Sequence, residues 1–228
     1  MIKKKMTPVA PAREQIPVIM SEMQTAADAL AGIGPAVSLF GSARIRHDSP
    51  YYAKAAAIAG ALAKAGFTII AGGGPGAMEA ANKGAYEAGG TSVGLNIKLA
   101  REPVDNPYQT HTLHFEYFYS RKATFFMHSM AYVALPGGFG TLDELFEALT
   151  LQQTRKVPPA PIVLVGSEYW SGLVGWIESQ MLSQGMISPA DMDLFTIEDD
   201  PAKVVDQVVS YFGRNLQEAG RQSPILQT

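Results

Sequence analysis

The stretch that decides the fold is Leu135-Pro136-Gly137-Gly138-Phe139-Gly140-Thr141-Leu142-Asp143-Glu144. A short apolar run typical of a buried strand, residues 131–135, leads into it, and residues 145–150 follow with helical spacing. A glycine-rich turn therefore joins a strand to a helix. Glycines let the backbone approach a ligand closely, and the free N–H groups and dipole of a helix start favour an anion. The stretch predicts a phosphate site of a nucleoside monophosphate, with Glu144 as a catalytic carboxylate.

Two earlier strand ends carry similar loops. Residues 36–40 lead into Gly41-Ser42-Ala43-Arg44, and residues 67–71 lead into Gly72-Gly73-Gly74-Pro75-Gly76. Because the carboxyl ends of parallel strands meet at one edge of a sheet, we expect all three loops to gather at a common site. The sequence therefore adds four candidate substrate-binding residues from these loops: Gly41, Ser42, Gly73 and Gly74.

Apolar strands alternate with helical segments along most of the chain, which predicts an α/β fold of the Rossmann-like kind. The sheet is expected to be doubly wound and parallel, with helices on both faces, because its strands are continuously apolar. We expect a single domain over residues 1–228, an N-terminal helix at 13–31, and loose tails at 1–12 and about 214–228. The other expected elements are helices at 51–64, 77–88, 117–129, 169–184 and 201–212, strands at 91–97, 111–115, 162–165 and 193–197, and an active-site loop at 98–110.

The composition narrows the classes of function. The 228 residues carry a net charge of -3 and no long basic stripe, so no nucleic-acid partner is expected. The absence of cysteine excludes disulfides, thiol catalysis and cysteine-bound metal. No apolar h-region follows the lysines near the start, and no run is long enough to span a membrane. We therefore expect a cytoplasmic protein without a membrane association.

Each candidate also has a simpler interpretation. Thr141 and Glu144 fit a capping box, in which the threonine caps the helix and the glutamate bonds back. Glu79 follows the second glycine loop as a candidate substrate residue, yet it also suits the dipole of its own helix start. From the residues alone, the favoured interpretation of Arg121-Lys122 is a solvated pair on a helix face.

Cofactor and metal sites are not indicated. The loop at 72–76 lacks the Gly-Lys-Ser/Thr ending of a triphosphate loop, and Pro75 interrupts the spacing of a dinucleotide site. No acidic ribose anchor follows the strand at 67–71. His111 and His114 would point to opposite faces of a strand and have no evident third ligand, so no metal is expected.

The motifs resemble one family. Residues 136–144 fit the signature P-G-G-x-G-T-x-x-E of the LONELY GUY family, the cytokinin riboside 5'-monophosphate phosphoribohydrolases. Arg121-Lys122 stands where that family has an Arg-Lys pair, and residues 72–82 and Asn106-Pro107-Tyr108 are similar to its longer bacterial branch. The resemblance extends from about residue 36 to the last helix. Members are often labelled lysine decarboxylases, but no lysine here has an identifiable pyridoxal-phosphate context.

The resemblance implies an activity and a set of roles. The expected reaction is hydrolysis of the N-glycosidic bond of AMP or an N6-modified AMP, giving a free base and ribose 5-phosphate, without a cofactor. Arg121 and Glu144 would be catalytic. The motif would hold the phosphate through Gly137, Gly138, Gly140 and Thr141, flanked by Pro136 and Phe139. Further implied substrate contacts are Glu102, Lys122 and Thr150, although Ala100-Arg101 replace the proline and aromatic residue that usually precede this glutamate.

The resemblance also implies a homodimer or a larger homo-oligomer. In the expected mechanism Glu144 stabilises an oxocarbenium-like ribose and activates water. Arg121 is always charged and hence a poor proton donor, so we expect it to pair with Glu144 and keep that carboxylate ionised. A non-catalytic carrier of a nucleotide or phosphorylated cofactor on the same fold is the alternative, as is a protein whose assembly responds to nucleotide.

Overall fold

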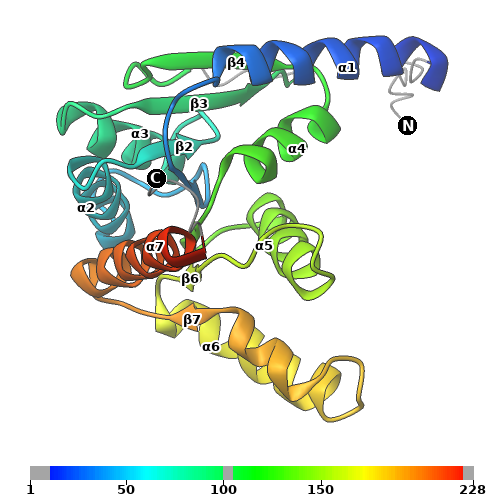
Figure 1. Ribbon diagram of the computed structural model, residues 1–228, viewed down its shortest axis with the longest axis vertical. Helices are drawn as coiled ribbons and strands as arrows, with labels where there is room; N and C mark the ends of the chain where they lie inside the picture. The colour runs from blue at the N-terminus through cyan, green and yellow to red at the C-terminus, as the bar shows by residue number, and fades with distance from the viewer. Residues whose placement is uncertain (1–10, 100–104, 223–228) are drawn as a thin grey trace, which may run out of the picture.

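The computed structural model describes residues 11–99 and 105–222, with the side chains described as far as residue 214. Seven parallel strands form one sheet in the order β4-β3-β2-β1-β5-β6-β7 (Figure 1). The strands are β1 (Ala36–Phe40), β2 (Thr68–Ala71), β3 (Ser92–Ile97), β4 (His111–Phe115), β5 (Tyr132–Ala134), β6 (Ile162–Leu164) and β7 (Thr196–Ile197). The predicted parallel α/β fold is confirmed.

Helices cover both faces of the sheet. The helices are α1 (Ala12–Ala29), α2 (Pro50–Lys64), α3 (Ala77–Glu87), α4 (Phe118–His128), α5 (Phe139–Gln153), α6 (Ser167–Trp176) and α7 (Pro201–Gln222). One core cluster joins α2, α3 and α7 to the sheet, and a second joins α1, α4, α5 and α6 to it. The central strands β1, β2 and β5 are buried along their whole length, as expected for strands covered on both sides.

Local sequence explains the boundaries of several elements. Helix α2 begins where the Ser49 side chain accepts a hydrogen bond from the Tyr51 N–H and proline occupies the first helical position. Apart from Ser38, strands β1, β2 and β5 consist of apolar and β-branched residues that fill the space under the helices. No helix in the described part of the chain combines the length and apolarity needed to cross a membrane.

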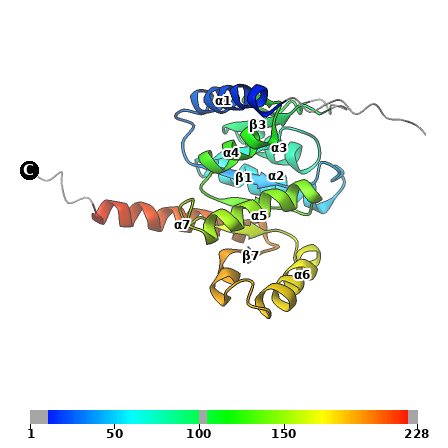
Figure 2. The same cartoon turned by 90° about the vertical axis from the view of Figure 1, so that its right-hand side faces the viewer.

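Some predicted boundaries were wrong. The helix expected at 169–184 ends at Trp176 and continues as one π-helical segment, Ile177–Leu182. The strand expected at 193–197 shrinks to two residues, because a 3-10 helix occupies Pro189–Leu194. The C-terminal tail expected from about 214 is helical to Gln222, and α7 projects beyond the sheet (Figure 2). The N-terminal tail at 1–12 lies almost entirely outside the described residues.

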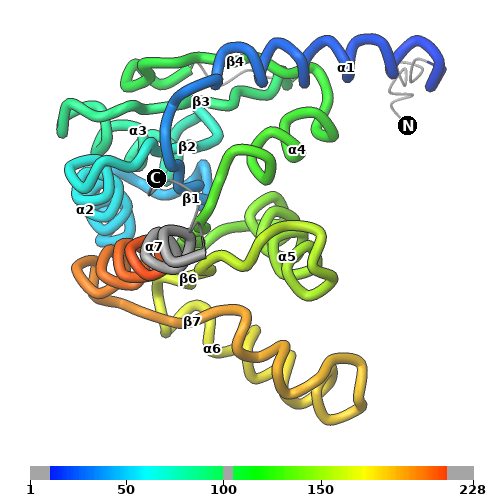
Figure 3. Tube along the Cα trace, viewed as in Figure 1, coloured from blue at the N-terminus to red at the C-terminus, as the bar shows by residue number. Residues whose placement is uncertain are grey.

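The path of the chain changes direction at the centre of the sheet. From β1 it moves outward through β2 and β3 to β4, and helix α4 then returns to β5 on the other side of β1 (Figure 3). The adjacent strands β1 and β5 therefore lead into helices of different core clusters, α2 after β1 and α5 after β5. Such a topological switch point forms a crevice at the carboxyl edge, where ligands bind in folds of this kind.

Candidate active site

The three glycine-rich loops meet at the switch point. The Ser42 N–H, after β1, donates to the Pro136 carbonyl after β5 at 3.1 Å, and the Ser42 carbonyl accepts from the Ala77 N–H at 3.0 Å. A Cβ on Gly41 would lie 2.5 Å from the Cβ of Ala77. Only glycine fits where these loops touch, so the loops after β1, β2 and β5 share one surface.

Helix α5 begins directly on the glycines of the motif. Its N-cap is Gly138, no side chain caps the helix, and Thr141 lies buried within the first turn. The capping-box interpretation is therefore wrong, because the helix starts three residues earlier than that pattern requires. Glu144 consequently stands in the second turn of α5 rather than bonding back to a cap.

The start of α5 is open to a ligand. Within the described residues, no acceptor takes the N–H groups of Phe139, Gly140 and Thr141. Gly138, Phe139 and Gly140 are all exposed, and a Cβ on either glycine would meet no atom within 4 Å. Unpaired N–H groups at a helix start, together with the helix dipole, form a site for an anion.

The turn itself is fixed from two sides. A Cβ on Gly137 would come within 2.1 Å of the Thr141 hydroxyl, so the threonine side chain packs where only glycine leaves room. The Tyr169 hydroxyl on α6 donates to the Gly137 carbonyl. This bond holds the residue directly before the N-cap of α5.

Arg121 and Glu144 lie together beside this helix start. A guanidinium nitrogen of Arg121, on α4, is 3.9 Å from a carboxylate oxygen of Glu144, on α5. Their side chains are only 8% and 14% exposed. Arg121 Nε also donates to the Leu95 carbonyl at 2.7 Å, and a second guanidinium nitrogen reaches the Gly72 carbonyl at 3.4 Å. Arg121 is therefore a buried, oriented cation, and its interpretation as a solvated residue was wrong.

Burial changes the protonation of this pair. It raises the pKa of Glu144 to about 7, and the Arg121 charge only partly opposes that rise. Lys122 also lowers this pKa, whereas the neighbouring carboxylates of Asp143 and Glu147 raise it. Burial likewise lowers the pKa of Arg121, against the effect of Glu144. The expectation that Arg121 keeps Glu144 ionised was therefore wrong, because desolvation outweighs the attraction.

Lys122 is engaged with carboxylates of α5. Its Nζ is 2.8 Å from Asp143 and 2.6 Å from Glu147. Burial lowers the pKa of Lys122, but its hydrogen bonds to these two carboxylates raise it on balance. Lys122 therefore joins α4 to α5 as a charged group next to the Arg121–Glu144 pair.

Three other candidates lie apart from the pair or outside the described residues. Glu79 receives the Tyr52 hydroxyl at 3.1 Å and lies 3.4 Å from the His47 ring nitrogen. Thr150 donates to Phe146 in its own helix and lines a small separate hollow with Ile177 and Met181. Glu102 falls among residues 100–104, which the structure does not describe.

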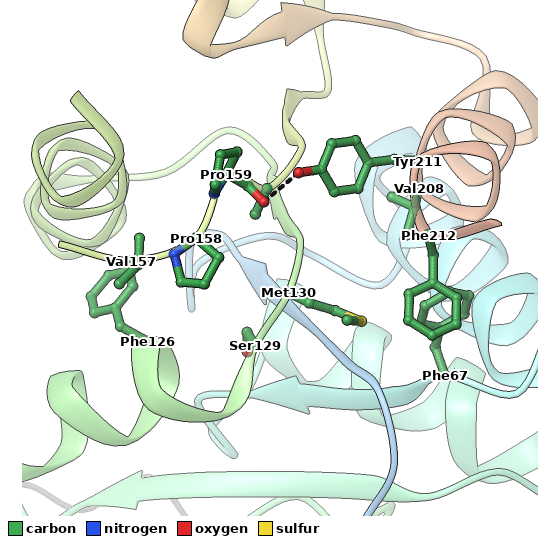
Figure 4. Close-up of a pocket in the computed structure, with 11 residues that line it drawn as sticks. Phe67, Phe126, Ser129, Met130, Val157, Pro158, Pro159, Val208, Tyr211 and Phe212 are labelled. Atoms are coloured by element: carbon green, nitrogen blue, oxygen red, sulfur yellow. Dashed lines mark hydrogen bonds between the residues drawn. The ribbon is translucent and has the colours of Figure 1, made fainter. Parts of the chain in front are cut away.

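An apolar hollow of about 450 Å³ lies elsewhere in the molecule. Figure 4 shows Phe67, Met130 and Pro158 lining it, with Phe212 of α7 packed against Phe67. These residues precede β2, β5 and β6, so the hollow opens at the amino edge of the sheet. It therefore lies across the sheet from the glycine-rich loops. No group of three metal-ligating side chains occurs in the described residues.

Sequence reasoning missed the residues that hold the glycine-rich loops. Asn96, Asn106 and Gln109 bond around Gly73, and Tyr169 bonds Gly137. Asn106 was noted only within a resembling motif, and the other three gave no signal in the sequence. The positive φ of Gly73, +75°, and its many neighbours explain why this loop needs such support.

The sequence of the chain is similar to that of known proteins. Residues 78–208 match the family model described as possible lysine decarboxylase. The cytokinin riboside 5'-monophosphate phosphoribohydrolase of Mycobacterium tuberculosis is 34% identical over 154 residues, which are 64% of this chain and 79% of that protein. The cytokinin riboside 5'-monophosphate phosphoribohydrolase LOG1 of Arabidopsis thaliana is 32% identical over 106 residues, covering 46% of this chain and 49% of that protein.

A solved structure shares the fold. The molybdenum cofactor carrier protein of Chlamydomonas reinhardtii has a TM-score of 0.59 and 21% identity, over 78% of this chain and 98% of that chain. At this identity the likeness concerns the fold alone.

Proposed function

The chain belongs to the LONELY GUY family, whose sequence model is described as possible lysine decarboxylase, and we propose that it is a nucleoside 5'-monophosphate phosphoribohydrolase. It would cleave the N-glycosidic bond of AMP or an N6-modified AMP. Water enters at C1', the base leaves with a proton, and ribose 5-phosphate is the second product. No cofactor is required for this hydrolysis.

The observation that carries the proposal is the buried Arg121–Glu144 pair beside an uncapped helix start. The two side chains approach to 3.9 Å, next to the unpaired N–H groups of α5. A phosphate at those N–H groups would bring the attached ribose toward the second turn of α5, which carries Glu144. An anion site next to a desolvated carboxylate suits a phosphorylated sugar whose reaction develops positive charge.

Glu144 has two tasks in this mechanism. Its carboxylate stabilises the oxocarbenium-like ribose and accepts a proton from the attacking water. A pKa of about 7 suits proton transfer near neutral pH, since the carboxylate then both accepts and returns a proton. Arg121 orients the carboxylate and the substrate oxygens, and the phosphate contributes binding energy that orients the ribose.

The decarboxylase description of the family does not suit the lysine next to the site. A lysine that forms a Schiff base needs a lowered pKa. The hydrogen bonds from Lys122 to Asp143 and Glu147 instead raise its pKa and keep it charged. A carrier of a nucleotide or phosphorylated cofactor is the alternative, and the fold of the molybdenum cofactor carrier is compatible with it.

Product analysis tests the proposal. Purified protein incubated with AMP or isopentenyladenosine monophosphate should release free adenine or isopentenyladenine, measured by chromatography. Adenosine should react far more slowly, because it lacks the phosphate that binds at α5. Equal rates on AMP and adenosine would contradict the assigned phosphate site. Nucleotide binding without release of any base would contradict the enzyme and support the carrier.

A further inference from the structure

The loop at 72–76 is held by buried amide side chains. The Gly73 carbonyl accepts three hydrogen bonds, from the Asn106 N–H at 3.0 Å, Asn106 Nδ2 at 2.9 Å and Gln109 Nε2 at 3.0 Å. Asn106 Nδ2 also contacts the Gly74 carbonyl at 3.2 Å and Asn82 Oδ1 at 3.0 Å. Two consecutive carbonyls are thus fixed toward residues 106–109.

The same side chains extend to strand β3. Asn96 Nδ2 donates to Gln109 Oε1 at 3.0 Å, and Asn82 Nδ2 donates to the Val93 carbonyl at 3.0 Å. Asn82, Asn96 and Asn106 are all buried, and each of them hydrogen-bonds to other groups of the protein. We call these three residues and Gln109 the amide network. A satisfied buried network is rigid, because each lost bond leaves an unpaired polar group.

Arg121 contacts two backbone carbonyls, and each belongs to a residue that directly precedes Asn96 of the network or Gly73, which the network bonds. Arg121 Nε bonds the carbonyl of Leu95, the residue before Asn96, at 2.7 Å. Another guanidinium nitrogen contacts the carbonyl of Gly72, the residue before Gly73, at 3.4 Å. A Cβ on Gly72 would lie 2.4 Å from this nitrogen, and one on Gly73 would lie 2.0 Å from the Asn96 amide. The loop therefore packs directly between the arginine and the network.

We propose that the amide network is a positioning device for Arg121, acting through the glycine loop at 72–76 and the end of β3. The network fixes Gly73 and Asn96, and these hold the neighbouring carbonyls that aim the guanidinium at Glu144. Among the described residues, none of the four amide side chains hydrogen-bonds to Arg121 or Glu144. Their effect on reaction rate rests on the proposed function, but their effect on the Arg121–Glu144 contact does not.

The proposal predicts a particular pattern in Gln109→Met. This change keeps the length of the side chain and removes its bonds to Gly73, Asn96 and Asn106. The kcat for base release from AMP should fall about 10- to 100-fold, the range that a small misplacement of a catalytic group costs. The KM should change little, because the phosphate is held by α5.

Gln152, near the end of α5, offers a matched control. Gln152 makes two hydrogen bonds to the backbone of Ala160, at 2.8 and 3.2 Å, and is part of no glycine loop. Gln152→Met therefore makes the same change of side chain, removes two hydrogen bonds where Gln109→Met removes three, and should leave kcat unchanged. Asn106→Ala serves as a second variant of the network. If Asn106→Ala does not fold, the result for Gln109→Met alone decides whether the network positions Arg121.

A carboxyl NMR titration of Glu144 separates this proposal from the proposed function. Four charged groups of the described residues act on Glu144, namely Arg121 and Lys122 from α4 and Asp143 and Glu147 from its own helix. If Arg121 shifts away, its favourable charge is lost and the Glu144 midpoint should move upward in Gln109→Met but not in Gln152→Met.

The outcomes are distinct. A fall in kcat with a raised Glu144 midpoint, confined to the network variants, would support the positioning role. An unchanged midpoint, a rise in KM alone, or an equal loss in Gln152→Met would overturn it. If the wild-type protein releases no base, the proposed function fails, and the titration alone decides whether the network positions Arg121.

Discussion

At the scale of single residues, the balance between burial and charge at Glu144 decides the chemistry. A carboxylate 14% exposed loses most of its hydration, and one arginine at 3.9 Å does not restore it. The pKa therefore rises to about 7 instead of falling. The sequence placed the pair correctly side by side, but its protonation could not be predicted, because burial depends on how α4 packs against α5.

This raised pKa gives a prediction about stability. A group whose pKa is raised in the folded state adds stability below its unfolded value, near 4.5, and loses it as pH rises through about 7. Glu144→Gln removes this dependence, so its stability relative to wild type should grow between pH 5 and pH 8, by on the order of 2–3 kcal/mol. Thermal unfolding of both proteins across this range measures the effect. If the stabilities of the two proteins change in parallel with pH, the pKa of Glu144 is not raised and the prediction fails.

At the scale of elements, helix α1 supports the helix that carries Arg121. The Glu22 carboxylate on α1 accepts the Glu116 N–H at 2.6 Å and the Ser120 hydroxyl at 2.5 Å. The N-cap of α4, Tyr117, provides no side-chain cap of its own. Glu22 therefore ties to α1 both the residue before the N-cap of α4 and a serine side chain in its first turn, and its negative charge suits that end of the helix dipole.

Removal of this acceptor should weaken the structure. We expect Glu22→Ala to reduce the free energy of unfolding by about 1–2 kcal/mol, because the charged acceptor of two hydrogen bonds between α1 and the start of α4 is lost. Urea denaturation measures the change. Gln24→Ala on the same helix is the control, since Gln24 is exposed and bonds only Asp28 within α1, and it should cost clearly less. Equal losses in the two variants would mean that Glu22 does not support α4.

At the scale of the whole molecule, the parallel direction of the strands and their cover by helices on both faces followed from sequence, whereas the order of the strands came from the structure. Continuous apolar runs such as residues 36–40 and 131–135 form strands because helices cover both faces. The exact start of α5 did not follow, since the glycines at 137 and 138 allow a helix that begins without a side-chain cap. Short or irregular elements, such as the π-helical Ile177–Leu182 and the two-residue β7, also lacked a clear pattern.

The candidate site also combines residues that were predicted from sequence with residues that only the structure revealed. Arg121, Glu144 and the motif at 136–141 were found from residue spacing and resemblance, and the structure brings them together. The amide network was missed, because its members lie on α3, β3 and the 105–110 segment and meet only in three dimensions. The homodimer and the single domain remain predictions.

The most direct test of the account is base release from AMP by the wild-type protein and Glu144→Gln, with the melting temperature of each recorded. We expect release by the wild type and a loss of orders of magnitude in the variant, which should melt no earlier at pH 8. Wild-type activity in a folded Glu144→Gln variant would contradict the central claim that this buried carboxylate performs the chemistry.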